Sequence, residues 1–192
     1  MNYYKHETAE VEDGATIGIN TKIWRHTHVR SGAIIGENCV LGQNVYIAET
    51  AIIGNNVHIQ NNVSIYNQIT LEDNVFVGPS VVFITDKRPR VGVVKTWPTL
   101  VKLGASLGAN STILCDITIG SYALIGAGSV VTKDIPDYAL FYGDPARLAG
   151  WVCKCGESID FANRYWPCIT ICKACGQKYN KEETVIALIQ ED

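Results

Sequence analysis

The chain has 192 residues, of which 47% are hydrophobic, and its formal net charge of −3 comes from 16 basic and 19 acidic residues. This length allows one main domain with a small appendage, and the mixed charge gives no electrostatic footprint for nucleic acid or an anionic membrane. The polar start "MNYYKHETAEVEDG" has no signal-peptide core, and no long apolar run follows it. We therefore expect a cytoplasmic protein without membrane insertion.

Residues 11 to 83 repeat with a period of six. An aliphatic or aromatic residue occupies the first position of every hexad: Val11, Ile17, Ile23, Val29, Ile35, Leu41, Ile47, Ile53, Ile59, Ile65, Leu71, Val77 and Phe83. A small or β-branched residue usually follows four positions later, and Gly, Asn and Asp gather between, as in "GENC" and "GNNV". An α-helix needs apolar spacing near 3.6 and a simple strand strict alternation, so the pattern predicts a hexapeptide-repeat solenoid of short parallel strands.

The repeat is interrupted at residues 84–100 and resumes at Val101, eighteen residues after Phe83. Eighteen residues are three hexads, so we expect this excursion to replace about one coil while keeping the phase. Segments of this length without repeats are usually functional or disordered. The cations of "DKRPR" and the aromatic of "TWP" favour a substrate-covering loop, and a solvated insertion is the alternative.

The composition changes after residue 150, where a cysteine-rich segment begins. Cys153 and Cys155 form one close pair and Cys172 and Cys175 another, each pair followed by Gly. Cysteines without a secretion signal are more often thiols or metal ligands than disulfides. The spacing predicts a zinc-ribbon-like segment at 151–192 after a solenoid domain at 1–150. Four thiolates leave no open position, so the zinc would be structural.

The most specific motif, "IGAGSVVTKDIPDYALFYGDPAR", closes the solenoid. With it, residues 11 to 150 resemble the left-handed parallel β-helix acyltransferases of the hexapeptide-repeat family. The resemblance implies acetyl-CoA as cosubstrate and a homotrimer with active sites between subunits. The left-handed coil also comes from the resemblance alone, because the usual rule for parallel crossovers favours the opposite hand.

Within that family, "IGENCVLGQNVYI", "TLVKLGASLGANSTI" and "YGDPARLAGWVCKCG" are most similar to N-acetyltransferases of nucleotide-linked 3-amino sugars. The resemblance implies acetylation of the 3-amino group of UDP-2-acetamido-3-amino-2,3-dideoxyglucuronate, for bacterial surface polysaccharide such as lipopolysaccharide O-antigen. A dTDP-3-amino-dideoxyhexose is the alternative substrate. A sugar O-acetyltransferase also stays open.

The coenzyme candidates come from positions eighteen apart and from the family motif. Small residues in "LGAN" and "IGAG" would stack on one edge and let a pantetheine arm approach the backbone, although they would also serve as mere corners. The full set is Gly108, Ala109, Gly126, Ala127, Thr132, Lys133 and Arg147. We expect the cations to meet phosphates through charge-assisted hydrogen bonds.

The catalytic candidates are Thr85, His28 and Glu49. Attack of an amine on a thioester needs a proton acceptor and a donor for the oxyanion. Other branches of the family carry a loop histidine where this chain has Arg88, which cannot act as a base. The sugar N-acetyltransferases place an asparagine where this chain has Thr85, so we expect Thr85 to orient the amine. Glu49 is a backup base or a solvated corner carboxylate, and His28 could face the acceptor.

The candidates for binding the nucleotide sugar are amides, an aromatic ring and loop charges. Gln43 and Asn61 are eighteen residues apart and so share a predicted edge, and an arginine can pair with a phosphate or a carboxylate through two hydrogen bonds. The alternative is that the asparagines only form turns, where asparagine is favoured. The set is Gln43, Asn61, Asn62, Tyr66, Asn67, Asp86, Arg88 and Arg90.

Two other classes of protein fit part of the pattern. A metal-dependent hydratase on the same fold would need three suitably placed histidines, and only His26, His28 and His58 lie in the repeats. A non-catalytic scaffold would need only regular hexads. The closing motif and the excursion favour the enzyme over both.

Overall fold

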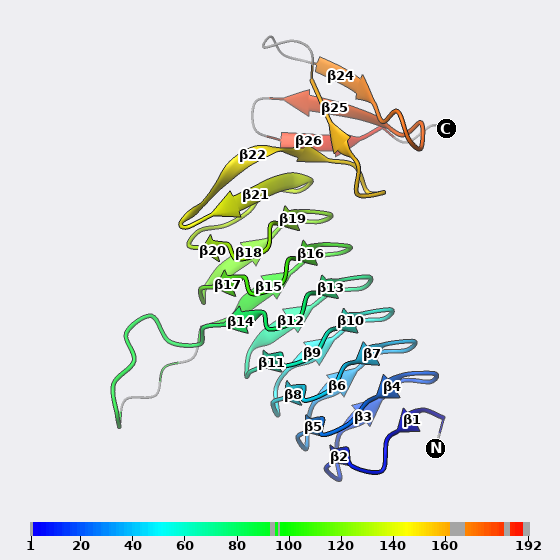
Figure 1. The fold of residues 1–192 in the computed structure, drawn as a ribbon, viewed down its shortest axis with the longest axis vertical. Helices are drawn as coiled ribbons and strands as arrows, with labels where there is room; N and C mark the ends of the chain where they lie inside the picture. Colours follow the sequence, from blue (N-terminus) through cyan, green and yellow to red (C-terminus); the bar gives the residue numbers. More distant parts are fainter. Residues whose placement is uncertain (1, 93–94, 96, 162–167, 183–184, 190–192) are drawn as a thin grey trace.

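Three faces run along a solenoid, and each full coil contributes one short strand to each face (Figure 1). The computed structural model describes residues 2–92, 95, 97–161, 168–182 and 185–189. All regular elements in these ranges are β-strands, as the repeat predicts. No helix among the described residues has the length and hydropathy needed to cross a membrane.

The first face is a parallel sheet that ends in antiparallel strands at the C-terminal end of the solenoid. Its strands are β1 (Tyr4–Lys5), β4 (Lys22–Ile23), β7 (Val40–Leu41), β10 (His58–Ile59), β13 (Phe76–Val77), β16 (Ser106–Leu107), β19 (Leu124–Ile125), β21 (Ala139–Gly143), β22 (Ala146–Val152) and β23 (Ser158–Ile159).

The second and third faces are wholly parallel. The second face holds two sheets, the first with β2 (Glu10–Val11), β5 (His28–Val29), β8 (Tyr46–Ile47) and β11 (Ser64–Ile65), and the second with β14 (Val82–Phe83), β17 (Thr112–Ile113) and β20 (Val130–Val131). The third face holds β3 (Thr16–Ile17), β6 (Ile34–Ile35), β9 (Ile52–Ile53), β12 (Ile69–Leu71), β15 (Thr99–Val101) and β18 (Ile117–Ile119).

The first position of each hexad points into the solenoid and forms its core. Ile23, Leu41 and Ile59, which succeed one another on the first face, have no exposed surface. Neighbouring strands lie about 4.8 Å apart, so equivalent side chains stack directly on the next coil. The core is therefore a set of continuous aliphatic columns, which explains why the period is kept without a gap.

The tight turns between strands need backbone conformations that β-branched residues resist. Seven asparagines adopt a left-handed conformation with φ between 55° and 60°: Asn20, Asn38, Asn44, Asn56, Asn62, Asn74 and Asn110. Asparagine tolerates this region because its short amide can hydrogen-bond locally. The sequence prediction that these residues form the corners is confirmed.

The excursion lies between β14 and β15, and it does not replace a coil. Below it Glu10 pairs with His28, an offset of eighteen residues, whereas across it Val82 pairs with Thr112, an offset of thirty. The difference is twelve residues, inserted inside the fifth coil. The expectation of a replaced coil is therefore wrong. The sequence could not distinguish an insertion from a replaced coil, because twelve inserted residues are two hexads and leave the phase of the repeat unchanged. Figure 1 shows the segment projecting from the solenoid.

A separate antiparallel sheet follows the last coil. It consists of β24 (Cys168–Ile171), β25 (Lys178–Glu182) and β26 (Val185–Leu188), and it lies beyond β22 at the C-terminal end (Figure 1). The predicted division at residue 150 falls within β22.

Candidate active site

The turns that follow the first-face strands form one edge of the prism, here called the first edge. Gln43 and Asn61 lie on it in successive coils, where the Gln43 backbone N–H donates to Asn61 Oδ1 at 2.8 Å. The next turns up the edge connect through Ser80 N to Asn61 O and Asn110 N to Pro79 O, both 3.0 Å. The edge then reaches Ala109 and Ala127, so the structure brings sugar-binding and coenzyme-binding candidates onto one line.

A hollow of about 470 Å³ opens at the lower part of the first edge. It is lined by Trp24, Arg25, Val40, Gly42, Gln43, Gln60 and Asn61. Arg25 Nε donates to His6 Nε2 at 3.1 Å, and Arg25 is an exposed residue. Trp24 and Arg25 were not among the predicted binding residues, and an exposed aromatic beside a cation was the signal for them.

The glycines on the first edge are needed for coil stacking whether or not a ligand binds. A Cβ on Gly108 would lie 2.5 Å from the Ala127 nitrogen, and one on Gly126 would lie 2.7 Å from Tyr142 Cβ. Both distances are below any normal contact, so these positions fit only glycine. Ala127 is exposed, so it is the more informative coenzyme candidate.

The remaining coenzyme candidates lie beyond the last coil. Thr132 and Lys133 follow β20 and are exposed, with Lys133 Nζ 5.9 Å from the centre of the Phe141 ring. Arg147 lies on β22 opposite Tyr142 and is also exposed. The two cations are available to an anionic ligand at the C-terminal end of the solenoid.

The turns that follow the second-face strands form a second edge, on which Glu49, Asn67 and Thr85 lie in successive coils. Asn67 Oδ1 accepts from the Thr50 backbone N–H at 3.2 Å, and Thr50 Oγ1 accepts from Gln68 N at 3.1 Å. Two coil steps of about 4.8 Å separate Glu49 from Thr85 by about 10 Å. A general base works within about 2.6–3.2 Å of its proton, so Glu49 does not reach a group bound to Thr85.

Glu49 also belongs to an ion-pair network lower on the second edge. Arg30 Nη2 donates to Glu49 Oε1 at 2.9 Å, and Arg30 Nε lies 2.7 Å from Glu12 Oε1. His28 Nε2 lies 2.8 Å from the same Glu12 oxygen, and the Ser31 backbone N–H donates to Glu12 Oε2 at 2.9 Å. The Ser31 hydrogen bond, with His28 and Arg30, lowers the pKa of Glu12 to about 2.

His28 lies on β5, at the foot of an aromatic line along the second face. Its ring meets Tyr46 edge-on at 5.7 Å between centroids, and Tyr46 lies 6.0 Å from Tyr66. From His28 to Val82 there are three coil steps, or about 14 Å. His28 is therefore paired with Glu12 and distant from Thr85.

The excursion carries a second hollow, of about 390 Å³, beside Thr85. Its lining residues are Asp86, Lys87, Arg88, Lys95 and Trp97. Lys87 Nζ donates to Asp116 Oδ2 at 2.6 Å and lies 4.5 Å from the centre of the Trp97 ring. Asp86 Oδ1 accepts from the Arg88 backbone N–H at 2.8 Å, whereas Arg90 turns to the Pro89 carbonyl and does not line the hollow. Lys87, Lys95 and Trp97 were not predicted individually, although the cations and the aromatic of the excursion were its notable feature.

The hollow in the excursion has the chemistry to hold a nucleotide diphosphate. Arginine and lysine pair with phosphate oxygens, and an indole ring offers a face for a base or a sugar. The Trp97 face is already covered in part by Lys87, so a planar ligand would compete with that cation. The first and second edges are separated by the whole second face, so one chain does not bring Thr85 to Ala109 and Ala127.

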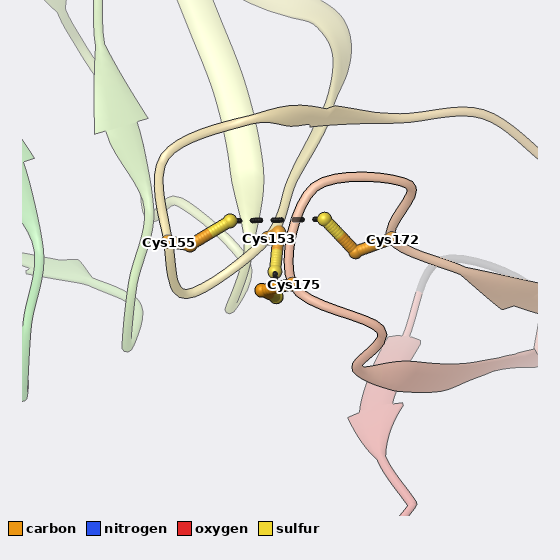
Figure 2. Close-up of side chains that lie close together, drawn as sticks. All are labelled: Cys153, Cys155, Cys172 and Cys175. Carbon is orange, nitrogen blue, oxygen red and sulfur yellow. Dashed lines mark hydrogen bonds between the residues drawn. The ribbon is translucent and has the colours of Figure 1, made fainter.

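The four paired cysteines meet at the C-terminal end of the solenoid (Figure 2). Cys153 and Cys155 follow β22, and Cys172 and Cys175 follow β24. Their sulfur atoms all lie within 4.8 Å of one another. Among the described residues, these four cysteines form a group that could hold a metal ion. The group lies at the C-terminal end of the solenoid, away from the excursion between β14 and β15 (Figure 1).

Comparison with known proteins shows the family to which this chain belongs. The family model "Bacterial transferase hexapeptide (six repeats)" matches residues 14–49 and 50–85, and "Hexapeptide repeat of succinyl-transferase" matches residues 32–67 and 104–133. The chain belongs to the bacterial hexapeptide-repeat transferases. Within them it is an acetyltransferase, as its relatives along most of the chain are.

One relative matches nearly end to end. The dTDP-3-amino-3,6-dideoxy-alpha-D-galactopyranose 3-N-acetyltransferase of Aneurinibacillus thermoaerophilus is 48% identical over 186 residues, which cover 96% of this chain and 94% of the relative. Among solved structures, the hexapeptide-repeat acetyltransferase VCA0836 of Vibrio cholerae, complexed with acetyl coenzyme A, is 29% identical with a TM-score of 0.57. The alignment covers 62% of this chain and 70% of that one. A putative acetyltransferase of Bacillus cereus is 26% identical with a TM-score of 0.52, over 79% and 83% of the two chains.

Proposed function

We propose that this protein transfers the acetyl group of acetyl-CoA to the 3-amino group of a dTDP-linked 3-amino-dideoxyhexose. The observation that carries this proposal is the 48% identity to an enzyme of that activity over almost the full length of both chains. The hollow beside Thr85 supports it, because its cations suit the pyrophosphate that every nucleotide sugar carries. The UDP-linked glucuronate expected from motifs alone is the competing substrate, and surface polysaccharide synthesis would use either product.

The proposed chemistry needs a neutral amine and no separate base in the chain. The amine nitrogen attacks the thioester carbon, the C–S bond breaks, and the amine proton passes to the departing sulfur, so the products are an amide and free CoA thiol. Thr85 would accept a hydrogen bond from the amine and hold its lone pair toward the carbonyl. No hydrogen bond joins Thr85 to a histidine or a carboxylate among the residues described by the structure.

Acetyl-CoA would lie along the upper first edge, with its pantetheine arm beside Ala109 and Ala127. The adjacent stacked turns expose backbone groups that can pair with the two amides of that arm, as in recognition of an extended peptide. Its phosphates would meet Lys133, Thr132 and Arg147 at the end of the solenoid. The amide side chains of Gln43, Asn61, Asn62 and Asn67 and the Tyr66 ring would contact the nucleotide sugar.

The active form is proposed to be a homotrimer of left-handed coils in the cytoplasm. The separation of the two edges supports the trimer, because a neighbouring copy can present its second edge to the first edge of this one. Each site would then combine Thr85 from one copy with Ala109 and Ala127 from the next.

The test is release of thiol from acetyl-CoA by the purified protein with either of two acceptors. The acceptors are dTDP-3-amino-3,6-dideoxygalactose and UDP-2-acetamido-3-amino-2,3-dideoxyglucuronate. We expect turnover with the dTDP sugar and at least tenfold lower kcat/KM with the UDP acid, a difference of about 1.4 kcal/mol in transition-state binding. Preference for the UDP acid would overturn the substrate, and silence with both amines would overturn N-acetylation. The 3-hydroxy analogue of the dTDP sugar is the control for O-acetylation.

A further inference from the structure

The four paired cysteines have the arrangement of a closed tetrahedral site. Cys153 Sγ lies 3.4 Å from Cys175 Sγ, and Cys155 Sγ lies 3.7 Å from Cys172 Sγ. Four thiolates at the usual Zn–S distance of about 2.3 Å would lie about 3.8 Å from one another in a tetrahedron. Both observed distances lie just below that value, and each joins a sulfur of one pair to a sulfur of the other (Figure 2).

The two pairs are carried by turns of the same construction. In the first, Cys153 N donates to Glu157 O and Gly156 N donates to Cys153 O, both at 2.8 Å. In the second, Cys172 N donates to Gln177 O and Gly176 N donates to Cys172 O, again at 2.8 Å. The two glycines have φ values of 93° and 76°, in the region that favours glycine. Two unrelated segments thus form similar closed turns, the second longer by one residue, that bring their sulfurs to one centre.

A pair of disulfides explains this geometry less well than one ion does. A disulfide holds its two sulfurs about 2.05 Å apart and places no condition on the other pair. A tetrahedral ion requires all four sulfurs to be mutually close, and here every sulfur lies within 4.8 Å of every other. Soft thiolate ligands in tetrahedral geometry select zinc or iron, and a closed set of four is typical of structural zinc.

A buried tyrosine connects this cluster to the solenoid. Tyr179 has no exposed surface, and its hydroxyl oxygen lies 3.0 Å from Cys153 Sγ. The same oxygen accepts from the Lys154 backbone N–H at 3.0 Å, so its own proton is available to the sulfur. The Tyr179 ring packs edge-on against Tyr138 at 5.2 Å, and Tyr138 stacks on Tyr122 at 5.4 Å. The cluster therefore stands on an aromatic column that begins in the last coil.

We propose that Cys153, Cys155, Cys172 and Cys175 bind one Zn²⁺ ion that clamps the sheet β24–β26 onto the end of the solenoid. Each thiol loses its proton on binding, so four protons are released and the four thiolates with the ion carry a net charge of −2. The first pair belongs to the hairpin that extends the first face, and the second pair belongs to the separate sheet. The ion would therefore link the hairpin to the sheet through four metal–sulfur bonds. Solenoids need such a cap because the last coil would otherwise expose its core.

The proposal is tested by metal analysis of the full-length protein produced with zinc in the medium, with no need of an activity assay. We expect one zinc per chain in the wild type and in Cys168→Ala, whose cysteine is buried on β24 outside the cluster. Cys172→Ser at a buried position and Cys155→Ser at an exposed one should both lose most of the zinc, and the exposed change is the one that leaves the packing intact. Co²⁺ exchanged into the wild type should show the visible bands of a tetrahedral thiolate site. A metal-free wild type with four titratable thiols, two disulfides, or bound iron would each overturn the zinc assignment.

The clamp itself is tested by limited proteolysis after zinc is removed with a chelator. We expect cleavage to begin within residues 153–189 while the solenoid stays resistant, and re-addition of Zn²⁺ to restore protection. If the chelated protein keeps the proteolysis pattern of the zinc form, the ion does not clamp the sheet. Acetyl transfer is not the readout, so this result is independent of the substrate proposed above.

Discussion

Thr85 is the residue whose replacement tests the proposed chemistry most directly. Thr85→Val keeps the shape and removes the hydroxyl, so one hydrogen bond to the amine is lost, worth about 1–1.5 kcal/mol. We expect kcat with the amino sugar to fall about tenfold with little change in the KM for acetyl-CoA. Steady-state kinetics measure both, and Thr70→Val on the third face is the matched control. A Thr85→Val enzyme with wild-type kcat would remove Thr85 from the mechanism.

Glu12 makes a residue-scale prediction about stability in acid. Its folded pKa of about 2 lies below the ordinary value of 4.5, so its carboxylate stabilises the fold above pH 4.5. That contribution falls as the pH drops from about 4.5 toward 2. The difference in free energy of unfolding between wild type and Glu12→Gln should be constant near neutral pH and shrink over this range, as urea melts at several pH values would measure. A difference that does not change below pH 4.5 would contradict the ion pairs, and Glu10→Gln is the control.

Glu49, Asn67 and Thr85 follow one another at intervals of eighteen residues, which is enough to place them on one edge, but this count does not show their partners. Glu49 was a candidate base until its distance from Thr85 and its pairing with Arg30 were seen. Counting gives the coil in which a residue lies, whereas rotamers decide which of several charged neighbours meet. Arg30 joins Glu12 and Glu49 from two different coils, and no periodicity in the sequence indicates that choice.

At the scale of elements, the sequence predicted the solenoid well because one constraint repeats. Every coil buries the same position, so each of the hexads from Val11 to Phe83 adds independent support for the same fold. The insertion inside the fifth coil could not be predicted, because an inserted length of two hexads leaves the pattern in phase. Strand pairing distinguishes an insertion from a replaced coil, as in the pairs Phe76 with Ser106 and Val82 with Thr112, both thirty residues apart.

Removal of the excursion tests its role in binding the sugar. Deletion of residues 87–98 restores the six-residue spacing between Phe83 and Val101 and joins Asp86 to Thr99. Asp86 would then lie at the corner equivalent to that of Asp116 in the next coil, where φ is 62°. A proline at this corner could not adopt that angle, so the deletion keeps Asp86 there and removes residue 98. We expect a folded protein that still binds acetyl-CoA and loses turnover of the amino sugar, measured by thermal shift and thiol release. Val91→Ser, at a fully exposed position outside the hollow, is the control. Wild-type turnover by the shortened chain would show that the excursion is only a solvated insertion.

At the scale of the whole molecule, a single chain keeps the proposed coenzyme-binding half of the site apart from the half that contains Thr85. The first edge carries the coenzyme candidates and the second edge carries Thr85, with the width of the second face between them. If a neighbouring copy completes the site, two different inactive variants should restore each other. Ala127→Trp blocks the first edge at an exposed alanine, and deletion of residues 87–98 removes the loop of the second edge. A trimer that holds both variants has one site in three with an intact half from each of two copies, so the activity of purified mixed trimers should return to about a third of wild type.

The matched control for this mixing experiment pairs Ala127→Trp with Ala109→Trp, because both variants damage the same edge and no mixed site is whole. Differently tagged subunits are co-expressed, trimers carrying both tags are purified, and light scattering checks that their mass is three times the 21.0 kDa chain. Restoration in the first mixture but not in the control would assign the site to two copies. No restoration in either mixture, with mixed trimers present, would place Thr85 and the coenzyme within one chain and would require the excursion to fold back across the second face. The distance between the two edges makes restoration the expected result.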